Sequence, residues 1–249
     1  MITPLLPAYP RTLHLGDSGG RASRHACDFA EVAGEHLVVE EKIDGSHCGL
    51  LFDDQAELRV FTRNTILESP PARRDFRLLD QLANEQMDGL WDVLGTRYVL
   101  YGEWALCAHT VFYDALPAYF LEDDVYDREA RRFLSTSRRR ELAAALPPAF
   151  ATSVPVLHEG PVESLAQLRQ LVGASTCKTE SWRARCPDLS RVEDSDAMEG
   201  LYIKHEDDDA VLRRLKWVRP GFLARIAEAG EHWRDRAPMH NALADDAEP

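Results

Sequence analysis

Charged side chains stand inside strand-like segments of this sequence, at positions where a strand would more often carry an apolar residue. They are Lys42, Glu103, Glu199, Lys204 and Lys216. Amines and carboxylates brought together in this way can act as nucleophiles, acid–base groups or anion-binding groups. Taken singly, each has a plainer explanation. Lys42 next to Glu41 could form a surface ion pair, and the other lysines could discourage pairing at sheet edges.

Strand periodicity predicts which of these side chains share a face. Successive side chains of a strand point to opposite faces, so Arg214 and Lys216 lie on the same side. Glu199 and Lys204 are five residues apart and would lie on opposite sides, unless Gly200 bends the strand. The sequence therefore predicts a basic pair on one strand and leaves the Glu199–Lys204 relation open.

The elements that position these residues follow from periodicity and breakers. We expect strands over 36–43, 48–52, 58–63, 97–104, 119–126, 200–204 and 212–218, with a turn at Asp44-Gly45 between the first two. We expect helices over 76–94 with a break near Gly89, and over 135–146, 164–173 and 222–233. Strands and helices interleave without a regular βαβ rhythm, which predicts an α+β fold that is largely antiparallel.

Composition limits the class of protein. The 249 residues carry 29 Lys and Arg against 42 Asp and Glu, a net charge of −13, with 45% hydrophobic residues. This is typical of a globular domain, and no run approaches the ~18 apolar residues of a membrane span. With no signal-peptide pattern, we expect a cytoplasmic protein that does not contact membranes. The five scattered cysteines form no CxxC pair, which favours reduced, packed thiols over disulfides or zinc.

The ordered set of motifs is more informative than any single residue. In chain order they are EKIDGSH (41–47), FTRN (61–64), LYGEW (100–104), YFLEDDVYD (119–127), MEGLYIK (198–204) and RRLKWV (213–218). This set resembles nucleotidyltransferase motifs I, Ia, III, IIIa, IV and V of covalent polynucleotide ligases. It is most similar to ATP-dependent RNA ligases, the class of the second phage RNA ligase and its bacterial relatives.

The resemblance implies a mechanism through a covalent intermediate. In that family the lysine of the KxDG motif attacks the α-phosphorus of ATP, expels pyrophosphate and carries AMP; Lys42 matches it. A lysine of ordinary pKa, about 10.4, is protonated at neutral pH and cannot attack. We therefore expect Lys204 and Lys216 to lie near Lys42 as activating cations, and the carboxylates of Glu41 and Asp44 to point away from it.

The resemblance also implies the other contacts. Arg63 would bind the ribose or a phosphate, Glu103 the ribose hydroxyls, Glu199 a metal ion, and Lys204, Arg214 and Lys216 the phosphates. The rest of motif I would contribute further nucleotide contacts from Glu41, Ile43, Asp44, Gly45, Ser46 and His47. ATP and two Mg²⁺ ions, with Mn²⁺ as an alternative, are the implied cofactors, and Glu199 and Glu103 the metal ligands.

Two positions depart from the family pattern. Relatives usually place an aromatic residue, stacked on adenine, where this chain has Asp123. Either Phe120 or Tyr119 takes over the stacking, or the base is held from one side only. Motif V usually opens with lysine, and here the matching residue is Arg214, which keeps the charge and grips phosphate well.

The resemblance implies three segments. Residues 1–34 would be a leader packed on or near the domain. Residues 35–220 would be the nucleotidyltransferase domain, with mainly antiparallel sheets flanked by helices and a nucleotide pocket between them. A loop-rich insertion would lie at about 174–198 within this domain. Residues 221–249 would be a short C-terminal helix and a frayed acidic tail. Residues 219–249 are too few to build the five-stranded OB domain of DNA ligases, so we expect none.

The implied function is ATP-dependent sealing of RNA with a 5′-phosphate and a 3′-hydroxyl, in RNA repair and with an RNA end-processing protein as a possible partner. Two alternatives stay open. One is an enzyme that only adenylates 5′ ends, or that seals DNA nicks. The other is an inactive nucleotide-binding module of an RNA-processing assembly, although retention of Lys42 speaks against it.

Overall fold

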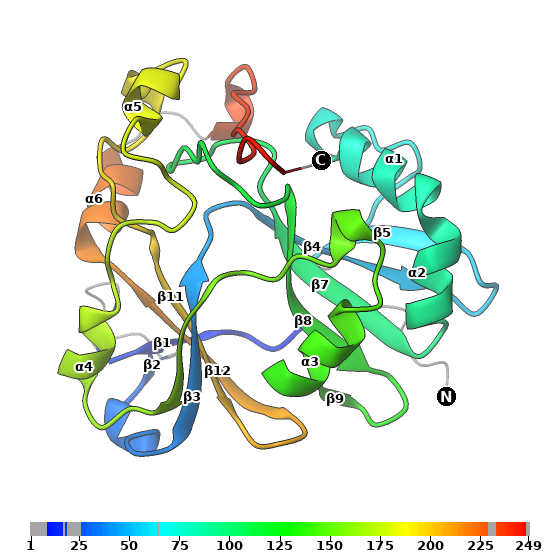
Figure 1. Cartoon of the computed structure of the whole chain (residues 1–249), viewed down its shortest axis with the longest axis horizontal. Helices are drawn as coiled ribbons and strands as arrows, with labels where there is room; N and C mark the ends of the chain where they lie inside the picture. Colours follow the sequence, from blue (N-terminus) through cyan, green and yellow to red (C-terminus); the bar gives the residue numbers. More distant parts are fainter. Residues whose placement is uncertain (1–8, 17, 19–25, 64, 229–232, 248–249) are drawn as a thin grey trace.

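Two six-stranded sheets face one another and form the body of the molecule (Figure 1). The computed structural model describes residues 9–16, 18, 26–63, 65–228 and 233–247. The first sheet has the order β10-β3-β11-β12-β1-β2, and the second has the order β6-β5-β4-β7-β8-β9. All described pairs are antiparallel except β1 with β12 and β1 with β2, so the α+β, largely antiparallel prediction is confirmed.

The strands have the following bounds. In the first sheet they are β1 Leu13–Leu15, β2 Ala26–Cys27, β3 His36–Lys42, β10 Val156–Pro161, β11 Gly200–Glu206 and β12 Val211–Val218. In the second they are β4 Ser46–Phe52, β5 Leu58–Thr62, β6 Thr65–Ile66, β7 Tyr98–Trp104, β8 Phe120–Asp127 and β9 Arg132–Phe133.

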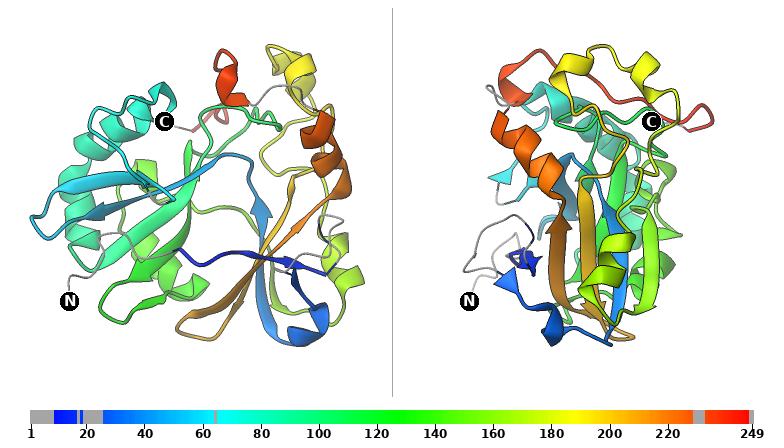
Figure 2. Two further views of the ribbon diagram at one scale, coloured as in Figure 1. Left: turned by 180° about the vertical axis from the view of Figure 1, so that it is seen from behind. Right: turned by 90° about the vertical axis from the view of Figure 1, so that its left-hand side faces the viewer.

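Helices cover the outer faces of both sheets (Figures 1 and 2). The α-helices are α1 Arg77–Glu85, α2 Met87–Leu94, α3 Thr136–Ala143, α4 Leu165–Gln170, α5 Trp182–Arg185 and α6 Pro220–Glu228. Short 3-10 turns lie at η1 Phe29–Glu31, η2 Arg74–Phe76, η3 Pro148–Phe150, η4 Leu189–Arg191 and η5 Trp233–Asp235. No helix among these described residues is long and apolar enough to cross a membrane.

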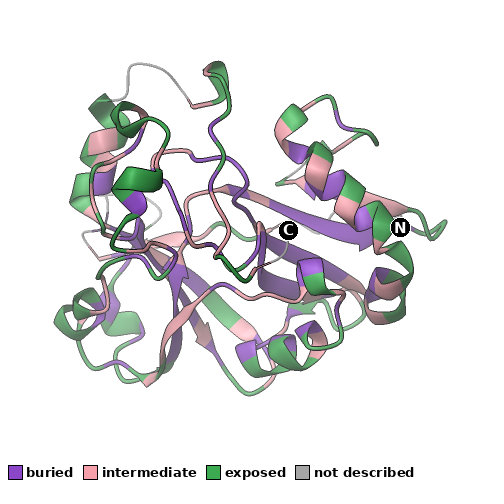
Figure 3. Cartoon of the chain, turned by 45° about the horizontal axis from the view of Figure 1, so that its top comes forward, coloured by how far each residue is buried: buried purple, intermediate pink, exposed green. Residues whose placement is uncertain are grey.

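Strand alternation separates the apolar outer faces from the polar inner faces. On β3, Leu37 and Val39 pack in the cluster on the outer face of the first sheet. Glu40 and Lys42 lie on the opposite face, which is turned toward the second sheet. Buried residues follow the sheets in Figure 3, while exposed residues concentrate on the helices. The inner faces thus carry the polar groups of the cavity beside smaller hydrophobic clusters, while the two largest clusters lie on the outer faces.

The first sequence motif is the connection between the two sheets. We expected a turn at Asp44-Gly45 inside one antiparallel segment, but β3 and β4 belong to different sheets and do not pair. A β-carbon on Gly45 would lie 2.8 Å from the backbone oxygen of Trp104 and 2.9 Å from Cγ of Glu103, so the crossing requires glycine. Lys42 and His47 therefore reach the space between the sheets from opposite walls.

The N-terminal leader contributes to the first sheet. Its residues 1–8, 17 and 19–25 lie outside the described part, but Leu13–Leu15 and Ala26–Cys27 form strands instead of the irregular structure that we expected. The prediction failed because β1 has only three residues, and its pairing with β12 is set by tertiary contacts. Leu215 and Lys216 are the partners of Leu13 and His14.

The ends of other elements also differ from the prediction. The helical segment predicted over 76–94 breaks at Gln86, not at Gly89, and Val156–Pro161 forms an additional edge strand. Ser164 caps α4 as expected, since its hydroxyl accepts a hydrogen bond from the Gln167 N–H. The predicted last helix ends at Glu228 in the described part, and residues 229–232 lie outside it.

The tail, which we expected to be frayed, is packed over much of its described length. Asn241 is buried, and its side chain donates to the Ala105 carbonyl and accepts from the Tyr113 N–H. Bridges pair His240 with Cys107 and Leu243 with Leu116. In its described part, the chain after Val218 forms α6, η5 and this packed extended segment, and the five cysteines are free.

Candidate nucleotide site

A cavity of about 630 Å³ lies between the inner faces of the two sheets. This volume falls in the range of small-molecule sites. The first sheet and the motif I connection contribute Glu40, Glu41, Lys42, Ile43, Tyr202 and Lys216; the second sheet and its adjoining loops contribute His47, Arg63, Glu103, Asp123 and Val154. The N-terminal segment completes the wall with Tyr9, Pro10, Arg11, Thr12 and His14.

Lys42 ends β3 beside two carboxylates. Its Nζ lies 2.7 Å from Oε1 of Glu199, while Glu103 approaches from β7 across the cavity. Burial disfavours the charged amine, but Glu199, Glu103 and Asp44 outweigh it and raise the pKa of Lys42. In this state Lys42 is an ammonium ion, so it must lose a proton before it can act as a nucleophile.

The same two carboxylates fit a divalent cation bound together with phosphates. Burial raises the pKa of Glu199 to about 7, and it raises the pKa of Glu103 well above its usual value. Mg²⁺ is typically held by one or two carboxylates plus substrate phosphates and water. The described residues contain no group of three His, Cys, Asp or Glu that would form a complete protein cage. Glu103 and Glu199 therefore suit an ion that arrives with a phosphate ligand.

Three cations that line the cavity have no side-chain partner. Arg11, Arg63 and Lys216 make no hydrogen bond or ion pair within the described part of the chain, and His14 lies on the strand next to Lys216. Burial, then the positive charges of Lys42, Arg63 and Arg11, lower the pKa of Lys216, with Glu199 opposing them. Arg11, Arg63 and Lys216 can therefore donate charge-assisted hydrogen bonds to the oxygens of a phosphate.

Motif I places its carboxylates away from Lys42. Glu41 points to the outer side of β3, where its carboxylate accepts hydrogen bonds from the hydroxyls of Ser175 and Thr176. The Asp44 carboxylate accepts from the backbone N–H groups of residues 110 and 111. Both orientations agree with our expectation, although Asp44 still acts on the pKa of Lys42 through its charge.

Other motif I residues take different positions. Ile43 and His47 line the cavity, whereas Ser46 is buried in the pairing of β4 with Trp104 on β7. His47 is stacked against Tyr101, with ring centres 5.7 Å apart. Burial lowers the pKa of His47 to about 4, which makes its ring neutral at pH 7.

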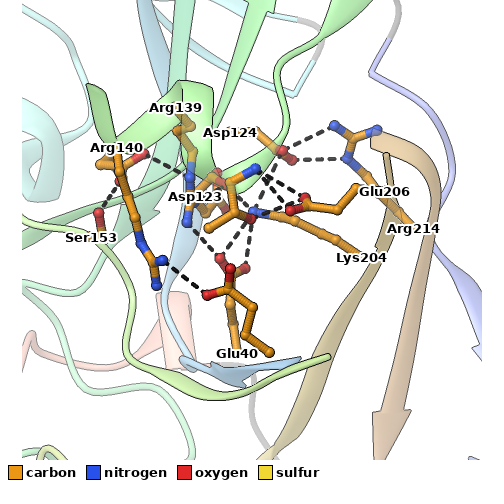
Figure 4. A network of polar contacts seen from close by, with 12 residues as sticks. Glu40, Asp123, Asp124, Arg139, Arg140, Ser153, Lys204, Glu206 and Arg214 are labelled. Atoms are coloured by element: carbon orange, nitrogen blue, oxygen red, sulfur yellow. Dashed lines mark hydrogen bonds and ion pairs between the residues drawn. The ribbon is translucent and has the colours of Figure 1, made fainter. Parts of the chain in front are cut away.

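Lys204 and Arg214, expected in the pocket, lie behind its wall in a buried network (Figure 4). Lys204 Nζ lies 3.0 Å from Oε2 of Glu40 and also donates to the Asp123 carbonyl. Arg214 binds Asp124 through two hydrogen bonds of 2.9 and 3.0 Å.

Arg139 of α3 is the third cation of this network. It binds Glu40 at 2.7 Å and lies 3.6 Å from Glu122. Its guanidinium also donates to the Asp123 carbonyl. The network thus matches three cations, Lys204, Arg139 and Arg214, with three carboxylates, Glu40, Glu122 and Asp124. Lys204 and Arg214 are consequently not open to a ligand in this structure.

The prediction that Phe120 stacks on a base is wrong. Phe120 is 1% exposed and packs in the core outside the second sheet, with its ring 5.3 Å from that of Phe150. Strand alternation explains this position, because Trp104 opposite Phe120 belongs to the same outer cluster. Tyr119, the other candidate, packs near Trp104 and donates to the Asn241 carbonyl. Neither lines the cavity.

A family model described as RNA ligase matches residues 35–218. The match covers well over half of the sequence and contains all the elements that bring the site together. The chain belongs to the RNA ligase family. No curated protein sequence matched it.

Solved structures share the fold of this RNA ligase-family chain. Naegleria gruberi RNA ligase with PPi superposes with a TM-score of 0.58 at 22% identity, over 80% of this chain and 53% of that one. A variant of the same ligase with ATP and Mn superposes with a TM-score of 0.54 at 20% identity, over 79% of this chain and 53% of that one. A variant with AMP and Mn gives the same values. The chain thus spans about half the length of these proteins.

The motifs of this RNA ligase-family chain did not include every residue of the cavity. The sequence did not predict that Tyr9, Arg11 and His14 line the cavity. They belong to the leader, and its three-residue strand is too short to be recognised from hydrophobic periodicity. Tyr202 could have been found, since it lies two residues before Lys204 and alternation places both on one face. Tyr9 reaches the other sheet: its hydroxyl hydrogen-bonds Asp124 at 2.5 Å and Tyr202 at 2.9 Å.

Proposed function

We propose that this chain is an ATP-dependent RNA ligase that works through AMP bound covalently to Lys42. The observation that carries the proposal is the position of Lys42. It lines a cavity together with three cations that make no hydrogen bond or ion pair within the described part of the chain. The Naegleria structures with ATP, AMP or PPi support a nucleotide as the ligand. Because the chain spans about half of those proteins, its substrates are part of the proposal.

The first step transfers AMP to the lysine. The neutral Nζ of Lys42 attacks the α-phosphorus of ATP, the bond from that phosphorus to the bridging oxygen breaks, and pyrophosphate leaves. Arg63 and Lys216 hold phosphate oxygens, with Arg11 as an additional contact that the motifs did not predict. Positioning in line and neutralising charge account for most catalysis of this type. A divalent ion, Mg²⁺ or Mn²⁺, would be held by Glu103 and Glu199 and supplies further neutralisation of the triphosphate.

Lys204 and Arg214 have a positioning role in this proposal. Each would have to leave a buried carboxylate to reach a phosphate, which is costly. They fix Glu40 and Asp124, and through them the inner faces that carry Lys42 and Tyr202. Contacts of Ile43 and His47 with the nucleotide remain part of the proposal, since both line the cavity.

The later steps act on RNA. AMP passes from Lys42 to a 5′-phosphate, and a 3′-hydroxyl then displaces AMP to form the phosphodiester bond, as expected for an enzyme of RNA repair. The test uses pre-adenylated nicked RNA and DNA duplexes without ATP. Sealing of RNA supports the proposal; sealing of DNA alone would assign a DNA nick ligase. If the protein takes up AMP but seals neither duplex, it is a 5′-adenylating enzyme.

The direct test of the first step is incubation with ATP labelled at the α-phosphate, in the presence of Mg²⁺, followed by a denaturing gel. We expect label that stays with the protein after denaturation. Incubation of the folded, labelled protein with pyrophosphate before the gel should release it. A protein that takes up no label in Mg²⁺ or Mn²⁺ would contradict the proposal.

The unpaired cations should govern nucleotide affinity. We expect Lys216→Ala to weaken binding of α,β-methylene ATP, which cannot transfer AMP, by about tenfold or more, the effect of losing one charged hydrogen bond. Arg63→Ala should act similarly. The matched control is Arg213→Ala, because Arg213 lies on the same strand but binds Glu31 on the outer face at 2.9 Å. Calorimetric titration would show unchanged affinity for this control; equal losses in all three variants would contradict the prediction.

The pH dependence should follow the amine of Lys42. Its raised pKa means that the reactive neutral form increases about tenfold per pH unit throughout the neutral range. We therefore expect the second-order rate constant of AMP uptake, measured below saturation, to rise about 100-fold from pH 7 to pH 9, since this constant reports the free protein. A plateau below pH 8 would show that Lys42 is deprotonated more easily than its neighbours Glu199 and Glu103 imply.

A further inference from the structure

We propose that Asp123 hydrogen-bonds the adenine base at its 6-amino edge. This inference rests on the function proposed above, and it names the group that selects the base. It assigns a role to a cavity-lining side chain that the motifs left without one.

Asp123 lines the cavity at a bulge of β8. In the pairing of β7 with β8, Tyr101 lies opposite Asp124 and Gly102 opposite Glu122, so Asp123 is the extra residue of a bulge. It is 8% exposed, and its buried Oδ1 has no hydrogen-bond partner within the described part of the chain. Bulges often redirect a side chain next to a functional site. Buried polar atoms in folded proteins normally have a hydrogen-bond partner, and a bound ligand can be that partner.

The His47 ring does not satisfy this carboxyl group. Its Nε2 lies 3.8 Å from Oδ2 of Asp123, beyond hydrogen-bond length, and this nitrogen also has no hydrogen-bond partner among the described residues. The backbone oxygen of Asp123, in contrast, is bound by Lys204 and Arg139. The backbone is therefore fixed while the side chain is left available.

The charges around Asp123 indicate which part of a nucleotide fits beside it. Facing it are Glu40 on β3, His47 on β4, Glu103 on β7, Asp124 on β8, Arg139 on α3 and Lys204 on β11. Arg139 and Lys204 are already matched by carboxylates, as described for the buried network. The two cations that act on the charge of Asp123 most strongly are thus already paired, whereas Arg11, Arg63 and Lys216 make no hydrogen bond or ion pair among the described residues. With the triphosphate at those cations and its α-phosphorus at Lys42, the uncharged base is the part that suits Asp123.

The buried network also acts on the protonation of Asp123. Its cations Lys204, Arg139 and Arg214 already pair with Glu40, Glu122 and Asp124, and Glu206 is buried near Lys204, so a further negative charge on Asp123 would be in excess. Burial, followed by the charges of Asp124 and Glu40, raises the pKa of Asp123 well above its usual value, against the opposing effects of Lys204 and Arg139. Burial and the neighbouring carboxylates therefore favour the protonated form of Asp123.

A protonated carboxyl group presents a donor and an acceptor side by side. Adenine presents the complementary pair, because its 6-amino group donates and the adjacent ring nitrogen accepts. Asparagine and glutamine side chains read adenine with the same pair of groups. The C=O of Asp123 would accept from the 6-amino group, and its O–H would donate to the neighbouring ring nitrogen.

The test combines a change in the protein with a change in the base. ATP is compared with purine riboside triphosphate, which lacks only the 6-amino group, by calorimetric titration of the wild type, Asp123→Asn and Asp123→Leu. We expect the wild type to prefer ATP by about tenfold, the effect of one hydrogen bond to a buried group. Asp123→Asn, which keeps a donor and an acceptor, should retain the preference. Asp123→Leu should lose both hydrogen bonds to ATP but only the one to the ring nitrogen of the analogue, so its preference for ATP over the analogue should fall below about twofold.

Several outcomes would overturn the inference. If Asp123→Leu keeps the wild-type preference, or if it weakens both nucleotides equally, Asp123 does not read the 6-amino edge. Thermal unfolding checks that all three proteins are folded, and no large change is expected because the side chain makes no hydrogen bond. Label uptake from ATP by the wild type separates the two proposals. If uptake is absent, the ligase proposal fails; if uptake is present without a base preference, only this inference fails.

Discussion

We expect a Lys42→Met variant to take up no AMP from labelled ATP, a loss of at least about 1,000-fold relative to the wild type. Methionine keeps much of the length and shape of the side chain but removes the attacking nitrogen, so no covalent adduct can form. The cavity and its unpaired cations stay in place, because Arg63 and Lys216 do not depend on Lys42 for a partner. Binding of α,β-methylene ATP, followed by calorimetry, should therefore change much less than transfer.

The matched control for this variant is Lys178→Met. The chain has four lysines, and Lys178 lies outside the cavity, where it donates to the Ser195 carbonyl at 2.8 Å and packs over Trp182. Burial lowers its pKa to about 8, so Lys178 has a larger neutral fraction than an ordinary lysine and is a good competitor for unspecific labelling. We expect Lys178→Met to label like the wild type. Label that persists in Lys42→Met and disappears in Lys178→Met would place the chemistry outside the cavity.

We expect a Lys204→Met variant to lose about 3–5 kcal/mol of unfolding free energy, the usual cost of removing one partner of a buried ion pair. Lys204 is 1% exposed and lies within 3.0 Å of Glu40 and 3.6 Å of Asp124. Without the amine, Arg139 and Arg214 alone would face the carboxylates of the network. Urea unfolding, followed by fluorescence and extrapolated to water, measures the change.

Lys216→Met is the control that separates stability from binding. Lys216 lies on the same inner face, but it has no ion pair to lose among the described residues and sits among other cations. We expect its unfolding free energy to stay close to that of the wild type while nucleotide affinity falls. If Lys204→Met unfolds like the wild type and loses only nucleotide affinity, then Lys204 is a phosphate ligand and not part of the buried network.

The sequence predicted the strands that carry the site with small errors at their ends. The strand predicted over 36–43 is His36–Lys42, and the one over 212–218 is Val211–Val218. Both have apolar residues at alternate positions, a pattern that depends on burial of one face and can be read without the fold. The leader strand Leu13–Leu15 has no such pattern, because three residues are too few and its partner is more than 200 residues away.

The motif residues could be assigned to one site from the sequence, but their neighbours could not. The KxDG pattern located Lys42, and alternation placed Arg214 and Lys216 on one face. Nothing in the sequence indicated that Phe120 belongs to the outer core, or that Tyr9 reaches across to Asp124 on the second sheet. These relations depend on how the two sheets are packed together.

The sequence by itself determined the family, the strand faces and the lysine proposed to carry AMP, because these follow from local order and a period of two. The tertiary structure decided which cations remain available to a ligand. Lys204, Arg214 and Lys216 all lie on the inner face of the first sheet, yet the first two are matched by Glu40 and Asp124, while Lys216 has no such partner in the described chain. Ion pairing in a buried space depends on distances between strands far apart in the sequence, and only the fold sets those distances.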